Sequence, residues 1–204
     1  MRIYPLILMT SICLAACGGD DDDEPGDGGN EGEVITTVAL NFAPEGGGDQ
    51  VTAVWDDPDS EGGAPPTIDP IDLTAGTTYT LTIEFLNRRE QPPEDITDEV
   101  EDESDQHQIF LTGTAVDGPA SDQDGAPLTH TYADEDADGL PVGLENTISA
   151  AAGTGELTVT LRHLPPVNDI AVKTSDLAQA VLDSGFGSLA GSTDVQVDFD
   201  VTVE

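Results

Sequence analysis

Acidic residues in the segment 132–149 have the spacing of a calcium-binding loop. In its sequence, YADEDADGLPVGLENTIS, three aspartates alternate with other residues, a glycine follows, and a glutamate closes the run. Calcium takes roughly six to eight oxygen ligands, and alternate acids converge on one point where a glycine lets the chain curl. We therefore predict a single calcium-binding turn with the ligands Asp134, Asp136, Asp138, Leu140 and Glu145. The alternative is a solvated acidic turn.

A second acidic loop, DPDSEGGAP at 57–65, is a weaker candidate for a metal site. It offers Asp57, Asp59 and Glu61 ahead of a glycine. The late acid of the calcium pattern is missing, because Ile68 stands at that position. A solvated turn is the favoured interpretation of this loop.

Two histidines stand at the ends of expected strands. His107 follows an acidic run in DESDQHQIF, and His163 ends the stretch LTVTLRH. Imidazole nitrogens together with a carboxylate bind zinc or copper. We predict that His107 and His163, with an acid such as Glu103 or Asp105, form a transition-metal site if the two strand ends meet. The alternative is a pair of surface histidines.

Catalytic motifs are absent from the sequence. It contains no G-x-S-x-G elbow, no H-E-x-x-H motif and no phosphate-binding loop of the P-loop type. Carboxylates are so numerous that no pair stands out as a glycosidase acid and base. We therefore expect a protein that is not an enzyme.

The N-terminus has the pattern of an export signal. Arg2 precedes an apolar run that ends in Leu-Ala-Ala-Cys, and the cysteine is Cys17. This ending resembles the lipobox of bacterial lipoproteins, in which the cysteine becomes the acylated first residue. We predict a signal peptide over 1–16, lipidation of Cys17 and a disordered acidic tether over 17–33. The protein would then be attached to the outer membrane through lipid, on its periplasmic or its cell-surface face.

The charge balance excludes one class of partner. The chain has 42 Asp and Glu against five Lys and Arg, a formal net charge of −37. Nucleic acid is bound through clustered Lys and Arg, so we expect no nucleic-acid partner. Salt or divalent cations reduce the self-repulsion of such a surface, which predicts a marine or halophilic source.

The elements that position these residues have the alternation of half-buried strands. Eight stretches alternate polar and apolar residues or are rich in β-branched ones, and they lie at 34–42, 50–55, 77–86, 108–116, 128–133, 144–150, 155–164 and 194–204. Short helical segments are expected within 92–106 and 175–185. We predict an all-β fold, a single antiparallel β-sandwich of about eight strands over 34–204.

Several phrases resemble those of a family of small acidic lipoproteins from marine Bacteroidetes and Gammaproteobacteria. They are EVITTVALNF, AGTTYTLTIEFLN, PEDITDEV with QHQIF, DADGLPVGL and GELTVTLRH, spread over most of 33–204. Members often carry a "type 1 periplasmic-binding" superfamily label, which describes longer chains with alternating strands and helices. The resemblance implies an exported lipoprotein and leaves its biochemical role open.

Three functions fit these observations. The first is a non-catalytic, lipid-anchored binding module of the cell envelope that calcium stabilises. The second is a lipoprotein that handles zinc or copper through the strand-end histidines and serves an outer-membrane receptor. The third is a structural or adhesive surface protein without an ion site.

Overall fold

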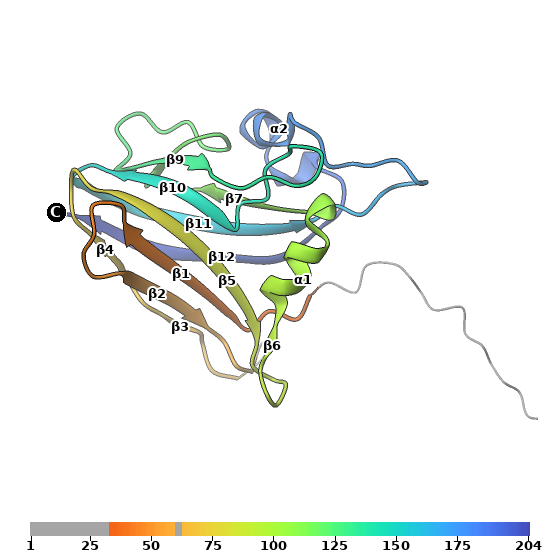
Figure 1. The fold of residues 1–204 in the computed structure, drawn as a ribbon, viewed down its shortest axis with the longest axis horizontal. Helices are drawn as coiled ribbons and strands as arrows, with labels where there is room; N and C mark the ends of the chain where they lie inside the picture. The colour runs from red at the N-terminus through yellow and green to blue at the C-terminus, as the bar shows by residue number, and fades with distance from the viewer. Residues whose placement is uncertain (1–32, 60–62) are drawn as a thin grey trace, which may run out of the picture.

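Two packed β-sheets and two short α-helices make up the part of the chain that the computed structural model describes, residues 33–59 and 63–204 (Figure 1). The predicted signal peptide, the lipid site at Cys17 and nearly all of the tether lie outside these residues. No helix in the described ranges is long and apolar enough to cross a membrane.

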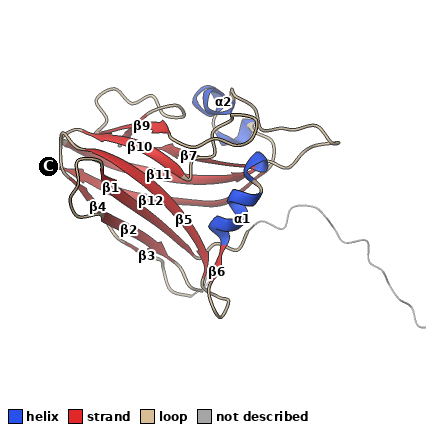
Figure 2. Cartoon of the chain, viewed as in Figure 1, coloured by secondary structure: helices blue, strands red, loops and turns tan. Residues whose placement is uncertain are grey.

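Strands form most of the regular structure, and the helices lie at its periphery (Figure 2). The elements are β1 (Thr37–Pro44), β2 (Val51–Asp56), β3 (Thr67–Ile68), β4 (Ile71–Leu73), β5 (Thr78–Asn87), β6 (Glu94–Asp95), α1 (Ile96–Asp102), a 3-10 turn η1 (Ser104–Gln106), β7 (His107–Thr112), β8 (Val116–Asp117), β9 (Leu128–Tyr132), β10 (Glu145–Ala150), β11 (Gly153–His163), α2 (Leu177–Ser184), a second 3-10 turn η2 (Phe186–Ser188) and β12 (Ser192–Val203). The larger sheet has the order β3-β2-β1-β5-β10-β9-β8, with β6 paired to β5. The smaller sheet has the order β4-β12-β11-β7.

Alternating apolar residues hold the two sheets together. Every second residue of β12 from Val195 to Val203 is buried, and so is every second residue of β5 from Tyr79 to Asn87. Apolar side chains from both sheets join in one continuous core. Each large one that leaves water contributes about 1.5–3 kcal/mol. The predicted all-β sandwich is confirmed.

The pairing of the strands differs from the prediction in two places. The sandwich is not wholly antiparallel, because β4 pairs with β12 and β8 pairs with β9 in parallel. The eight predicted strands all form, but β3, β4, β6 and β8 were not expected as separate strands. These have two or three residues each. Such short runs give no alternation from which a strand can be predicted.

Both sheets end in short edge strands. The larger sheet is bounded by β3 and β8, of two residues each, and the smaller one by β4, of three, and β7, of six. The free side of β7 is partly covered, because the Ile109 amide donates to the Val142 carbonyl at 2.7 Å. The short strands cover only part of their neighbours, because β4 pairs with β12 only at Val201–Val203 and β3 pairs with β2 only at Trp55 and Asp56.

The helices close one end and one face of the sandwich. Asp95 caps α1 by accepting the Thr97 amide, and Ile96 and Val100 turn inward into the main core. The Thr97 hydroxyl also accepts the amide of Phe85 in β5 at 3.0 Å, which fixes α1 beside this strand. Helix α2 covers a second, smaller apolar cluster formed by Phe110, Ala120, Leu164, Leu177 and Val181. Helices in both predicted segments are thus confirmed.

Candidate metal centre

The two strand-end histidines lie against each other. His107 begins β7, His163 ends β11, and the pairing of these antiparallel strands sets the two residues directly opposite. Their rings stack with centroids 4.8 Å apart and planes inclined by 14°. In β-strands alternate residues share a face, so both histidines continue the inward-facing rows that contain Ile109 and Leu161. The meeting of strand ends that the metal hypothesis required is present.

Each histidine has a buried nitrogen without a hydrogen-bond partner. His107 is 0 % exposed, and its Nδ1 lies 3.1 Å from the Glu103 carbonyl oxygen. A carbonyl oxygen only accepts, so Nδ1 carries the proton and Nε2 has the free lone pair. The Nε2 atom of His107 and the Nδ1 atom of His163 are both buried and unpartnered. A buried imidazole nitrogen without a partner is unusual, and a metal ion is one partner that would satisfy it.

Burial keeps His107 in the form that binds metal. Removal from water lowers the pKa of His107, and the hydrogen bond to the Glu103 carbonyl only partly opposes this effect. The ring is therefore neutral at pH 7, with its lone pair available. Metal ions bind the neutral imidazole, because a protonated ring has no lone pair to give.

Glu103 supplies a third ligand next to the histidines. It ends α1, and its carboxylate and one nitrogen of each histidine lie within 4.8 Å of one another. Two atoms bound to one zinc ion at about 2.0–2.2 Å are no more than about 4.4 Å apart, so the ligand atoms are close to the required spacing. Binding would also require the stacked rings to turn, because the lone pairs of nearly parallel rings do not point at one centre. Two imidazoles and a carboxylate form a donor set typical of zinc or copper. Asp105, the other acid considered, is not part of this group.

Further carboxylates surround the histidine pair. Asp194 is the extra residue of a β-bulge in β12, opposite the step between Leu161 and Arg162. Both of its oxygens are buried without hydrogen bonds. Burial raises the pKa of Asp194 to about 6, although His163 and Arg162 favour its charged form. A bulge re-aims a side chain, and here it adds a carboxyl group beside His163.

The start of the described chain adds an acid as well. Burial and the neighbouring Glu99, Asp194 and Glu103 raise the pKa of Glu33 to about 7. Burial is the main cause for both Glu33 and Asp194, and only for Glu33 do neighbouring acids add to it. A bound cation would favour the charged form of both groups. The sequence does not indicate Asp194, Glu33 or Glu99 as site residues, because no local pattern shows a bulge or the approach of distant segments.

The predicted calcium turn uses its carboxylates differently. Asp134 accepts the amides of Gly143, Leu144 and Glu145 at 2.7, 2.7 and 2.9 Å, with both of its oxygens engaged. These bonds hold the incoming and outgoing arms of the turn together. The side chain of Asp134 is therefore a structural bridge within the turn.

Asp136 has its own set of partners. Its Oδ1 accepts the amides of Asp138 and Leu140 at 3.0 and 2.9 Å, while its own amide donates to the Leu140 carbonyl. Its Oδ2 lies 2.8 Å from the ammonium of Lys173, and both side chains are only 1 % exposed. Lys173 also donates to the Ser104 carbonyl at 2.7 Å. A cation thus does sit on this turn, and it is the ammonium of the chain itself.

The arrangement of the turn corrects the predicted ligand geometry. The oxygens of Asp134, Asp136 and Leu140 are taken by amides and by Lys173, whereas Asp138 and Glu145 are exposed. The five predicted ligands do not form a common oxygen shell. Calcium binding at this turn remains a prediction without support from this geometry.

The weaker acidic loop gives no ligand cluster among its described residues. The Asp59 carboxylate accepts the amide of Ala64 at 3.1 Å and is hydrogen-bonded to the Asp57 side chain. These bonds lower the pKa of Asp59. Glu61 lies outside the described residues.

Comparisons with known proteins add no identity to this geometry. A scan against protein-family models and searches among curated proteins and solved structures found nothing that matches the chain. The functional argument therefore rests on the residues of the site.

Proposed function

We propose that this protein is a non-catalytic metal-binding module of the cell envelope that takes up zinc or copper through His107, His163 and Glu103. The observation that carries the proposal is the facing pair of imidazoles, each with a buried, unpartnered nitrogen, next to a carboxylate. This donor set matches zinc or copper better than calcium, which prefers an all-oxygen shell.

The surroundings support reversible uptake of a cation. Asp194 and Glu33 lie near the site with raised pKa values, and a bound divalent ion would be stabilised by their charged forms. Protons compete for the same groups, so binding should weaken as the pH falls below about 6. A module of this kind suits capture of metal at a membrane and transfer to an outer-membrane receptor.

The location is the second part of the proposal. Its support is the Leu-Ala-Ala-Cys ending at Cys17, which would attach the domain to the outer membrane, and the acidic stretch that follows. Labelling of cells with a radioactive fatty acid tests it: we expect label in the wild-type protein and none after Cys17→Ser. Equal labelling of both chains would remove the anchor from the proposal.

A metal titration tests the binding function. Zinc and copper affinities are measured by competition with a chelating dye, and the nitrogen hyperfine pattern of bound Cu²⁺ is recorded. We expect His107→Gln and His163→Gln each to weaken binding by about 100-fold or more, since ligands matter at least as much as the groups that orient them. The spectrum should lose the signal of one imidazole in each variant.

Two glutamates of the same segment provide a matched control. Glu103→Gln should weaken binding, whereas Glu101→Gln should leave it unchanged, because Glu101 is not part of the ligand group. Thermal melting checks that every variant is folded. Unchanged zinc and copper affinity in the doubly substituted histidine variant would end the proposal.

A further inference from the structure

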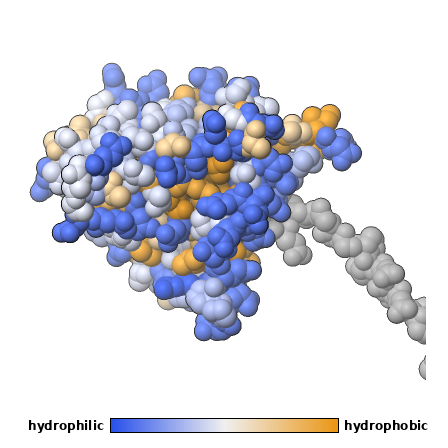
Figure 3. Space-filling view, in the orientation of Figure 1, coloured by the Kyte–Doolittle hydropathy of each residue, from blue (hydrophilic) through white to orange (hydrophobic). Residues whose placement is uncertain are grey.

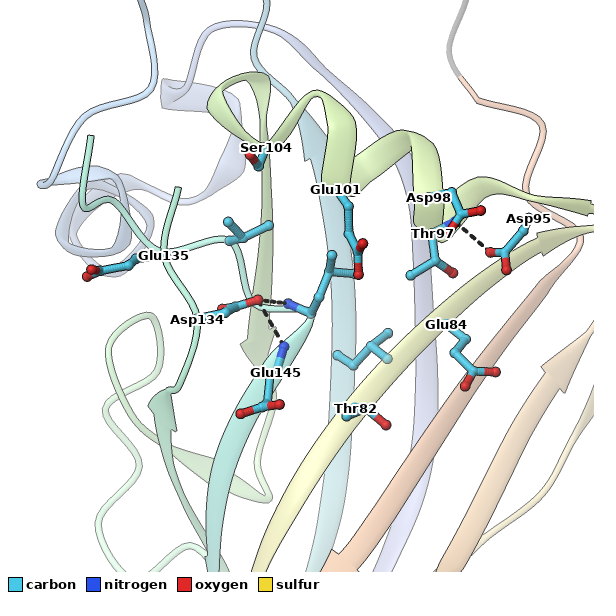
Figure 4. Close-up of a pocket in the computed structure, with 13 residues that line it drawn as sticks. Thr82, Glu84, Asp95, Thr97, Asp98, Glu101, Ser104, Asp134, Glu135 and Glu145 are labelled. Atoms are coloured by element: carbon cyan, nitrogen blue, oxygen red, sulfur yellow. Dashed lines mark hydrogen bonds between the residues drawn. The ribbon is translucent and has the colours of Figure 1, made fainter. Parts of the chain in front are cut away.

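A groove opens on the other side of α1 from the histidine pair. It lies between α1, β5 and the turn that precedes β10, and its volume is about 620 Å³ (Figure 4). The groove exists because β5 changes its neighbour here. The Ile83 amide still donates to the Leu144 carbonyl at 3.0 Å, whereas the next inward-facing residue, Phe85, donates its amide to the Thr97 hydroxyl of α1.

The floor of the groove is apolar. Ile83, Val142 and Leu144 line it, and the first two are almost fully buried. Figure 3 shows an apolar surface at this place, surrounded by hydrophilic residues. The floor is thus a site where an apolar group would leave water, at a gain of about 25 cal/mol per Å².

The rim of the groove is acidic. Exposed carboxylates stand on both sides, with Asp98 and Glu101 on α1 and Glu84 and Glu145 on the sheet, and no Lys or Arg is among the lining residues described. In Figure 4 Glu101 reaches from α1 over the groove, with Glu84 and Glu145 on the sheet side. The rim repels anions and attracts cations from both sides.

The combination selects the chemistry of an occupant. A bare metal ion gains nothing from an apolar floor, and an uncharged apolar molecule gains nothing from the carboxylates. A volume of about 620 Å³ lies in the range of small-molecule sites. We propose that this groove binds a small organic diamine or polyamine, with its methylene chain on Ile83, Val142 and Leu144 and its ammonium groups at Glu101 and Glu145.

This second site is separate from the metal centre. Glu103 belongs to the histidine group, whereas Glu101 lines the groove. The two therefore give independent measurements, and the diamine experiment uses protein that has been stripped of transition metals and then dialysed free of chelator, because a chelator would also bind the Mg²⁺ probe.

Calorimetric titration of the full chain with three probes tests the proposal. The probes are octanediamine, octylamine and Mg²⁺ at matched ionic strength. We expect octanediamine to saturate at one molecule per chain, to bind more tightly than either other probe, and to shift the backbone NMR signals of Ile83 and Leu144. Equal affinity for octylamine would remove the need for two charges, and equal affinity for Mg²⁺ would remove the role of the floor; either result overturns the proposal.

Two pairs of charge-neutralising substitutions separate the groove from the general acidity of the chain. Glu101→Gln with Glu145→Gln should weaken octanediamine binding about fivefold to tenfold, as expected for the loss of two exposed ion pairs. Glu45→Gln with Asp49→Asn removes the same charge from exposed residues outside the groove and should leave binding unchanged. All four positions are exposed, so folding is preserved. Equal losses in both pairs would mean that the diamine only condenses on an acidic surface.

Discussion

The buried ion pair between Lys173 and Asp136 gives the sharpest test of how the acidic turn is held. The Lys173 ammonium lies 2.8 Å from Asp136 Oδ2 and 2.7 Å from the Ser104 carbonyl, and both side chains of the pair are 1 % exposed. The substitution Lys173→Met keeps the length of the side chain and removes the charge. Asp136 is then a buried carboxylate without its counter-ion.

The size of the effect follows from the burial. At 2.8 Å two unit charges attract by about 6 kcal/mol for an effective dielectric constant of about 20. Much of this attraction is offset by the cost of taking both charges out of water. Removing one partner of a buried pair costs about 3–5 kcal/mol, because the other charge stays buried. We expect Lys173→Met to lose this amount of unfolding free energy at pH 7.5.

The free energy of unfolding that Lys173→Met loses should increase with pH. Burial alone would raise the pKa of Asp136, but Lys173 and the amides of Leu140 and Asp138 outweigh it and lower this pKa. In the wild type the stabilisation by Asp136 is therefore complete above the unfolded pKa and is lost only as the pH falls through the lower folded value. In Lys173→Met only the two amides oppose burial, so the folded pKa of Asp136 is higher than in the wild type, and the variant gains less of this stabilisation as the pH rises. The difference between the two chains should grow from pH 5 to pH 7.5.

Urea unfolding at these two pH values measures the effect. Trp55, which packs partly buried against the main core, provides the fluorescence signal, and pH 5 stays above the isoelectric point of about 4.1. The double variant Asp136→Asn with Lys173→Met keeps an acceptor for the two amides and buries no charge. It should be more stable than Lys173→Met at pH 7.5 and should show little of its pH dependence.

A surface ion pair provides the matched control. Arg88 lies 3.0 Å from Asp56, but its side chain is 49 % exposed. We expect Arg88→Met to cost less than about 1 kcal/mol at both pH values. If Lys173→Met costs no more than Arg88→Met and is equally insensitive to pH, then the Lys173 pair is hydrated and the argument from burial is wrong.

Two further predictions concern the turn and a glycine. Asp134→Ala leaves three amides without their acceptor and should lower the free energy of unfolding in urea by about 2–4 kcal/mol. In the wild type, Ca²⁺ and a chelator at matched ionic strength should give the same melting midpoint. A higher midpoint with Ca²⁺ would restore the prediction of calcium binding at this turn. Gly191→Ala should cost at least about 3 kcal/mol, because at φ +76° the added Cβ overlaps the His163 carbonyl oxygen. Gly139→Ala, at φ +75° with only the Glu135 carboxylate near the added Cβ, at 4.0 Å, should cost only about 1–2 kcal/mol, and equal costs at both glycines would contradict the overlap.

Much of the fold could be predicted from the sequence because its strands are long and alternate strictly. In β12 the valines and Phe199 recur at every second position, and these residues are the buried ones. The order of the strands could not be predicted, since it depends on contacts between distant segments. The placement of His107 opposite His163 follows from the pairing of β7 with β11. The sequence by itself indicates only that each histidine lies at one end of a strand.

The acidic turn shows why a motif can predict that the chain turns and still give the wrong partners for its carboxylates. The chain does turn at Gly139, but the oxygens of the alternate acids bind separate amides and Lys173 and do not converge on one point. Backbone amides satisfy Asp134 in the same way that a cation would, and Asx-type turns use the same residues. Lys173 lies in a segment without periodicity, 69 residues from Ser104, and no local pattern indicates that it reaches this turn.

The short edge strands have a consequence for how these molecules behave when crowded. At neutral pH the formal charge of −37 keeps copies apart, but near the isoelectric point of about 4.1 this repulsion disappears. A β-rich protein then risks joining edge to edge into fibrils. Here β4 pairs with β12 only at Val201–Val203, so the outer side of the rest of this long strand has no strand beside it. Acidification should therefore favour the joining of copies through the outer side of β12.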